Sequence, residues 1–303
     1  MHKHKHGVTA AGRHRRRLAA VLAITVAVLV AEVVGAVLSG SLALLADAGH
    51  LAGDAVGIGL ALFAVWMGGR PTTPQRTFGY QRAEIIAALV NGLLLLGLAG
   101  YVGYQAVLRL IQPEPVGTTI MVVFGLVAAV GNGISLLVLS VGQKESLTIR
   151  GAFLEVASDA LGALAVLVAA GVLALTGFTR ADAIASLAIA ALIVPRTLHL
   201  LRDAVDVLLE ATPRGVDLEE VRRHLLDAPG VRDVHDLHAW MITSGVPVVS
   251  AHVVVEDAIL ADGGYGRLLD QLLDCLAGHF DVDHSTLQLE PAGHVDHERA
   301  HHI

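Results

Sequence analysis

Three ionisable side chains lie inside a strongly apolar segment of the sequence. Asp47, His50 and Asp54 occur in LLADAGHLAGDAV, and the run of small and aliphatic residues continues to about Trp66. Residues three and four apart share one face of a helix. Imidazole nitrogens and carboxylate oxygens are ligands for divalent transition metals. The spacing therefore indicates either a metal site or a set of polar contacts between helices.

A second apolar segment repeats this pattern with Glu155 and Asp159 in LEVASDALG. A charged side chain at the bilayer centre costs about 2.5 to 3.5 kcal/mol, and such residues usually mark ion pathways. Together with His50 and Asp54, these residues would supply one imidazole and three carboxylates to a tetrahedral site. The alternative is a set of hydrogen bonds or ion pairs between helices. Three acids around one histidine would, however, repel one another without a cation or protons.

Other polar residues in the apolar runs are weaker candidates. We expect Glu32 and Asp47 either to support the ligands or to relay protons, and we expect Asn91 and Asn132 to serve packing. Asp182 is a candidate for either kind of role.

Six apolar runs are long enough to hold these residues within a membrane. Each has roughly 20 residues or more, the length that crosses a hydrocarbon core of about 30 Å. Short separators with turn residues divide them. The expected spans are 18–38, 42–67, 85–108, 117–141, 151–176 and 183–201.

The composition agrees with membrane insertion, because 54% of the 303 residues are hydrophobic and only 16% are charged. The basic RHRRR before the first run is typical of a signal peptide, but the run exceeds a signal core, so we expect a retained helix. The single cysteine, Cys275, excludes an intramolecular disulfide.

The distribution of basic residues predicts the orientation in the membrane. If the N-terminus is cytosolic, thirteen Lys and Arg face the cytosol and only Arg109 and Arg180 face outward. This asymmetry predicts that both termini are cytosolic.

The pattern changes after about residue 212. Residues 213–303 carry 6 basic and 16 acidic side chains, whereas residues 1–212 carry 15 and 12. Amphipathic and alternating segments follow in the order αββαβ.

We therefore expect an all-α bundle of six transmembrane helices and a small α+β domain. The expected segments are a basic, histidine-containing cytosolic N-terminus (1–17), a transmembrane transport domain (18–210), a cytosolic αββαβ domain (213–291) and a His-rich tail (292–303).

The sequence resembles the cation diffusion facilitator family, six-span divalent-metal transporters that are often specific for zinc. The resemblance rests on GSLALLADAGHLAGD, TFGYQRAE, the SD of LEVASDALG, RADAIASLAIA, VHDLHAW and SAHVVV. It implies a homodimeric exporter that moves Zn²⁺ from the cytosol in exchange for protons. His50, Asp54 and Asp159 match the family's transport-site pattern. Glu155 stands where zinc-specific members mostly have His, so the exported ion could also be Mn²⁺, Fe²⁺, Co²⁺ or Cd²⁺.

The resemblance also implies that the cytosolic domain is metallochaperone-like. His235, His252 and Glu290 lie where the family often has ligands, and His238 is a further candidate. The short loop between the fourth and fifth spans lacks the His-rich insert of many eukaryotic members, which favours a bacterial plasma-membrane protein.

Two other classes of function are less consistent with the sequence. Neither HExxH nor GxSxG occurs in a context that would support catalysis, so we expect a secondary active transporter and not an enzyme. A membrane-bound metal sensor without transport would use the tail histidines but would not need matched acidic pairs in two spans. We expect no nucleic-acid partner.

Overall fold

The computed structural model describes residues 15–140, 147–261, 263–280, 282 and 284–294. Most of the predicted N-terminal segment and His-rich tail lie outside these residues, as does the end of the fourth predicted span. The chain forms two compact units, one of residues 1–59 with 90–199 and the other of residues 60–89 with 200–303.

All six predicted spans are helices, and each is long and apolar enough to cross a membrane. The last one extends beyond its predicted end at residue 201. Its final turns are amphipathic, with Ala204 buried and Arg202 exposed, so helical structure continues past the apolar run. Pro195 lies inside this helix without ending it. The helices are α2 (Arg15–Ser39), α3 (Leu42–Gly68), α4 (Ala83–Ile111), α5 (Thr118–Ser140), α6 (Leu147–Thr176) and α7 (Ala181–Leu208).

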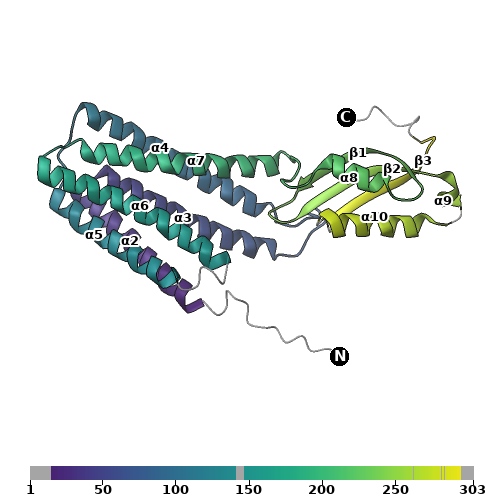
Figure 1. Cartoon of the computed structure of the whole chain (residues 1–303), viewed down its shortest axis with the longest axis horizontal. Helices are drawn as coiled ribbons and strands as arrows, with labels where there is room; N and C mark the ends of the chain where they lie inside the picture. The colour runs from purple at the N-terminus through teal and green to yellow at the C-terminus, as the bar shows by residue number, and fades with distance from the viewer. Residues whose placement is uncertain (1–14, 141–146, 262, 281, 283, 295–303) are drawn as a thin grey trace. The chain divides into compact units, whose positions relative to one another are not determined.

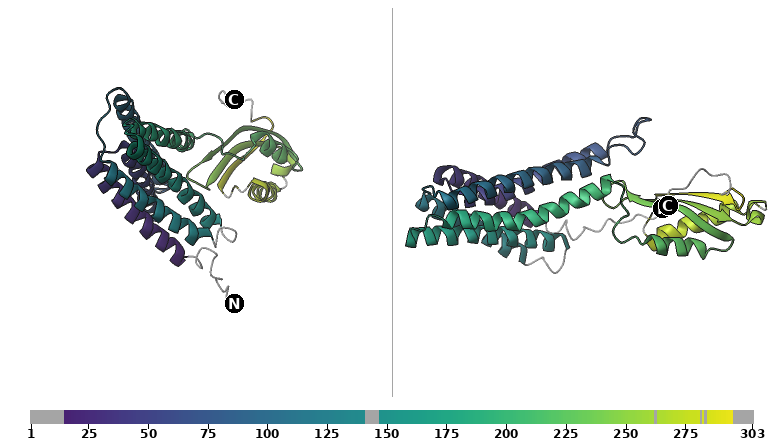
Figure 2. Two further views of the ribbon diagram at one scale, coloured as in Figure 1. Left: turned by 60° about the vertical axis from the view of Figure 1, so that its left-hand side comes forward. Right: turned by 90° about the horizontal axis from the view of Figure 1, so that it is seen from above.

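Small residues let the helices of the first unit approach closely, as expected for packing in lipid. Helix α5 packs against both α2 and α6, which lie beside it in Figures 1 and 2. Helix α6 meets α3 at Gly162, where the Cβ atom of any other residue would clash with Asp47 Oδ1. Glycine at this position therefore leaves room for the buried Asp47 side chain.

Asp182, at the start of α7, caps the beginning of α3. Its carboxylate accepts hydrogen bonds from Ser41 Oγ at 2.5 Å and from the backbone N–H groups of Leu42 at 2.9 Å and Ala43 at 3.2 Å. The first N–H groups of a helix have no partner within the helix, so a buried helix start needs such an acceptor. Arg109 donates to the Gly40 carbonyl at 2.6 Å beside this cap. Asp182 therefore has a structural role.

The C-terminal domain has the predicted order, with one short extra helix, α9. Its elements are α8 (Leu218–Leu226), β1 (Val231–Met241), β2 (Pro247–Val255), α9 (Asp257–Ala261), α10 (Tyr265–Phe280) and β3 (His284–Pro291). Strand β2 is central, antiparallel to β1 and parallel to β3. Helices α8 and α10 cover one face of the sheet, as the right-hand view of Figure 2 shows.

The core of this domain lies between those helices and the sheet. Alternate residues of a strand point to opposite faces, so every second residue of β2 enters the core and the others face away from the helices. The buried core includes Val221, Leu225, Val249, Ala251, Val253, Val255, Leu268, Leu272 and Leu276.

Loss of the Asp182 cap should destabilise the transmembrane unit. Asp182→Ala removes the acceptor of two helix-start N–H groups, and we expect a loss of about 1 to 2 kcal/mol, the cost of removing a strong N-cap. The measurement is the thermal unfolding midpoint of the purified protein in detergent. Asp182→Asn, which keeps one acceptor oxygen, should lose less, and an equal midpoint for Asp182→Ala and the unaltered protein would refute the capping role.

Candidate metal centres

The first candidate site lies within the helix bundle. His50 and Asp54 come from α3, and Asp159 comes from α6. His50 Nε2 is 3.6 Å from Asp159 Oδ1 and 3.7 Å from Asp54 Oδ2. One ligand atom from each of the three residues lies within 4.8 Å of the other two. Because zinc bonds to N and O ligands are about 2.0 to 2.2 Å long, separations of this size suit donors around one ion.

These donors are poorly satisfied without an additional ligand. His50 and Asp159 are buried, and Asp54 is partly buried. Among the described residues, His50 Nδ1, Asp54 Oδ2 and Asp159 Oδ1 find no hydrogen-bond partner. Burying polar atoms without partners is costly, and two carboxylates sharing one site repel each other. A cation between the three side chains would remove both penalties.

The fourth predicted ligand, Glu155, is paired with Arg196 and also lies within hydrogen-bonding reach of Asp54. It lies one helical turn before Asp159 on α6, and its two carboxylate oxygens accept from Arg196 Nη2 of α7 at 2.7 and 2.9 Å. Glu155 is therefore not part of the three-residue group. Sequence reasoning overlooked this contact, because it counted Arg196 only as a cytosolic charge. The signal was an arginine within the sixth apolar run.

Glu32 and Asp47 form a second buried acidic pair close to this group. Glu32 is fully buried on α2, within hydrogen-bonding reach of Asp47. Among the described residues, no donor reaches either Glu32 oxygen or Asp47 Oδ2. Two carboxyl groups in contact can form a hydrogen bond only if one of them carries a proton. Asn91 and Asn132 are also buried in the bundle.

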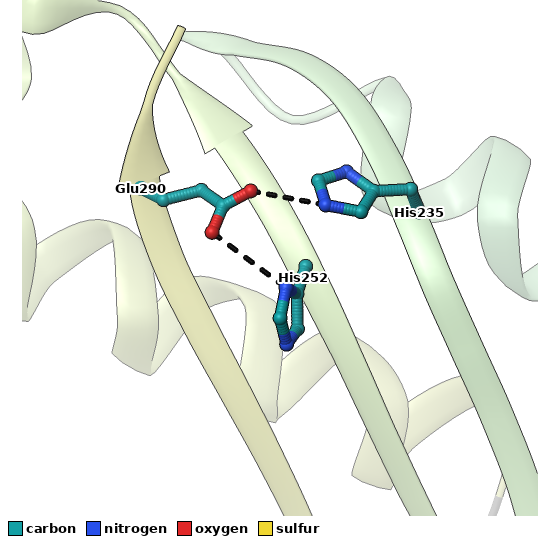
Figure 3. Close-up of side chains that lie close together, drawn as sticks. All are labelled: His235, His252 and Glu290. Atoms are coloured by element: carbon teal, nitrogen blue, oxygen red, sulfur yellow. Dashed lines mark ion pairs between the residues drawn. The ribbon is translucent and has the colours of Figure 1, made fainter. Parts of the chain in front are cut away.

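The second candidate site lies on the face of the sheet that the helices leave uncovered. His235 Nε2 is 3.1 Å from Glu290 Oε1, and His252 Nδ1 is 3.6 Å from Glu290 Oε2. Figure 3 shows both imidazoles directed at the one carboxylate. Glu290 is buried, and the two imidazole rings lie 5.2 Å apart. His294 Nε2 is 3.9 Å from Glu290 Oε2.

The register of the sheet brings these three residues together. His235 of β1 pairs with His252 of β2, and Glu290 of β3 pairs with Val254, two residues along β2 from His252. A bulge follows, because the next paired residue of β1 is His238, opposite Ser250. His238 is exposed and lies 3.4 Å from Asp236, so the structure does not bring it into the group.

The fold and these groups describe a multi-pass membrane protein with convergent imidazole and carboxylate side chains inside its bundle and a further cluster in its C-terminal domain. Residues 18–209 match the family model for the cation efflux transmembrane domain, and residues 213–292 match that for the cation efflux protein, cytoplasmic domain. The chain belongs to this cation efflux family, the cation diffusion facilitators. The family consists of metal transporters and is not a class of enzymes.

Several curated proteins are similar over nearly the whole chain. The cation efflux system protein CzcD of Alcaligenes sp. is 41% identical over 302 residues, which cover 100% of this chain and 93% of the relative. The cadmium, cobalt and zinc/H(+)-K(+) antiporter of Bacillus velezensis is 34% identical, covering 97% and 93%. The zinc transporter ZitB of Escherichia coli is 35% identical, covering 95% and 91%.

Proposed function

We propose that this protein exports divalent transition-metal cations, with Zn²⁺ as the main substrate, in exchange for protons. The observation that carries this proposal is the buried convergence of His50, Asp54 and Asp159 from two helices. The names of the relatives support it, because they include a zinc transporter and an antiporter of cadmium, cobalt and zinc with protons and potassium.

The charge and chemistry of the three donors suit a doubly charged borderline-soft ion. Two carboxylates neutralise a dication, and the imidazole nitrogen favours zinc, cobalt and similar metals over magnesium or calcium. A fourth position of a tetrahedral ion remains for water or for Glu155. An incompletely surrounded ion can leave the site, as transport requires.

Glu155 and Arg196 would adjust the site during transport. While Glu155 is paired with Arg196, it is withheld from the ion. An arriving dication competes with the guanidinium for this carboxylate. We propose that Glu155 exchanges between the two, so that Arg196 limits how tightly the ion is held and speeds its release.

Proton exchange follows from the same ligands. A metal ion binds the deprotonated forms of imidazole and carboxylate, so loading the ion releases protons and unloading it allows them to return. Glu32 and Asp47, which are buried beside the site but do not belong to its three donors, would hold or pass on such protons.

The C-terminal domain would bind metal through His235, His252 and Glu290. We propose that both termini lie in the cytosol of a bacterial cell, that the protein resides in the plasma membrane, and that it is a homodimer. Metal bound on the uncovered sheet face would then report the cytosolic concentration to the transport domain.

A measurement of ion flux distinguishes this function from the alternative, a metal sensor without transport. Proteoliposomes containing an exporter accumulate or lose Zn²⁺ when a pH gradient is imposed. A sensor in the same vesicles binds Zn²⁺ without moving it.

Removing either site carboxylate should abolish transport. Asp54→Asn and Asp159→Asn keep the side-chain volume but remove a charged ligand, so we expect Zn²⁺ flux in pH-gradient proteoliposomes to fall to the background rate. Glu114→Gln, at an exposed carboxylate paired with Arg109, is the matched control and should transport normally. Near-normal flux in both site variants would exclude this group as the transport site.

Removing the charge of Arg196 should raise the affinity for Zn²⁺ and lower the turnover rate. Arg196→Gln frees Glu155 and removes a positive charge, so we expect KM for Zn²⁺ to fall about tenfold, equivalent to about 1.4 kcal/mol, and kcat to fall as well. Both are measured from initial flux rates. In Glu155→Gln protein the added Arg196→Gln change should have a much smaller effect on KM. Additive effects of the two changes would disprove the proposed exchange, since coupled residues show an interaction free energy.

Glu155 should also influence metal selectivity. Replacing it with His in the Arg196→Gln background gives a softer ligand and leaves no unpaired arginine, so the ratio of Zn²⁺ to Mn²⁺ flux should rise. The measurement is competition between the two ions in the same vesicles. An unchanged ratio would mean that Glu155 does not contact the transported ion.

A further inference from the structure

The helical face of the C-terminal domain carries three further side chains of types that bind metals, although their ligand atoms do not all lie within 4.8 Å of one another, as those of the two sites above do. Cys275 and His279 are four residues apart on α10, and His224 lies on the neighbouring helix α8. The imidazole rings of His224 and His279 have their centroids 5.1 Å apart. The core-facing side of the same two helices packs on the sheet. This group therefore lies on the opposite side of the sheet from His235, His252 and Glu290.

Two donors of this group already have the separation of zinc ligands. Cys275 Sγ is 3.7 Å from His279 Nδ1. In a tetrahedral site with Zn–S of about 2.3 Å and Zn–N of about 2.0 to 2.1 Å, sulfur and nitrogen are about 3.5 Å apart. The i, i+4 spacing on α10 thus gives two donors the separation of one edge of a coordination tetrahedron, although His279 Nδ1 now donates a hydrogen bond to the Cys275 carbonyl and must give it up to bind a metal.

His224 can supply a third donor once its side chain rotates. Its Nδ1 lies 2.9 Å from the Glu220 carbonyl oxygen, an acceptor, so Nδ1 carries the hydrogen and donates. The lone pair of Nε2 is then available to a metal. Histidine ligands generally donate their other ring N–H to such a carbonyl or carboxylate, which fixes the tautomer. The Phe280 ring packs edge-on against His224 at 5.1 Å and limits the positions of the imidazole.

We propose that Cys275, His279 and His224 form a binding site for a thiophilic divalent cation, of which Zn²⁺ and Cd²⁺ are the representative ions. Cys275 Sγ and His279 Nδ1 bind first, and a rotation of the His224 side chain brings Nε2 to the ion. For this, His279 Nδ1 gives up its 3.1 Å hydrogen bond to the Cys275 carbonyl, the ring hydrogen moves through solvent from Nδ1 to Nε2, and the Cys275 thiol releases its proton to water.

The surroundings favour such an ion. The excess of acidic over basic residues in 213–303 attracts cations to the domain. A sulfur and two imidazoles select zinc or cadmium over Mg²⁺, Ca²⁺ and Mn²⁺, which prefer oxygen ligands.

Cys275 makes the site directly testable, because it is the only cysteine of the protein. The rate of alkylation by iodoacetamide in the full-length protein in detergent therefore reports this thiol alone. We expect saturating Zn²⁺ to slow alkylation by at least about tenfold, while Mg²⁺ has no effect. Measurement with and without metal in each variant corrects for any change in the intrinsic reactivity of the thiol.

Amino-acid substitutions test whether these three residues are responsible for the protection of Cys275 by Zn²⁺. His279→Asn and His224→Asn should lose most of it, or need about ten to a hundred times more Zn²⁺ to reach it. His252→Asn, which alters the site on the other face, and Asp159→Asn, which alters the bundle site, should keep it. If Zn²⁺ fails to slow alkylation of the unaltered protein, or protects both histidine variants at the same concentration, the site does not exist as proposed.

A second measurement tests the proposal even if one of the histidine variants fails to fold. Co²⁺ bound by a thiolate gives a charge-transfer absorption that carboxylate and imidazole ligands do not produce. We expect this absorption in the Co²⁺-loaded protein and its loss in Cys275→Ser, and its absence from the unaltered protein would overturn the proposal. Neither measurement involves ion flux, so the result is independent of whether the bundle transports metal.

Discussion

The free energy of placing charged groups in an apolar interior is the constraint on which this structure depends. The bundle is built mainly from Ala, Val, Leu and Gly, yet His50, Asp54 and Asp159 meet inside it. Several of their atoms find no hydrogen-bond partner among the residues that the structure describes, and this is tolerable if a dication or protons occupy the space between them. The proposed function is thus the simplest way to reconcile these side chains with their surroundings.

Glu155 and Arg196 meet the same constraint without an external ion. The guanidinium neutralises the carboxylate within the protein, so the pair adds no net charge to the bundle. In the proposed transport cycle, this resident cation competes with the transported one. Such competition would keep a site with three anionic side chains from holding a dication too strongly, which matters because a transporter must release what it binds.

The two faces of the C-terminal domain carry different ionisable groups. Strand alternation places aliphatic side chains under α8 and α10 and leaves His235, His252 and Glu290 on the uncovered face. The outer surfaces of the helices carry the group of Cys275, His279 and His224. A domain of modest size can therefore offer two chemically distinct surfaces to cations, one with carboxylate and imidazole donors and one with sulfur and imidazole donors.

The sequence by itself determined the six spans, the order of the C-terminal elements and the placement of His50 and Asp54 on one helix face. These follow from hydrophobic length and from helix and strand periods, which are local properties. Only the tertiary structure decided that Glu155 faces Arg196, that Asp182 caps a helix 140 residues earlier in the chain, and that a bulge separates His238 from His235. These contacts depend on how each helix is rotated against its neighbours and on the register of the strands. Packing between residues far apart in the sequence sets the helix rotations and the strand register, and the spacing of residues along the chain does not.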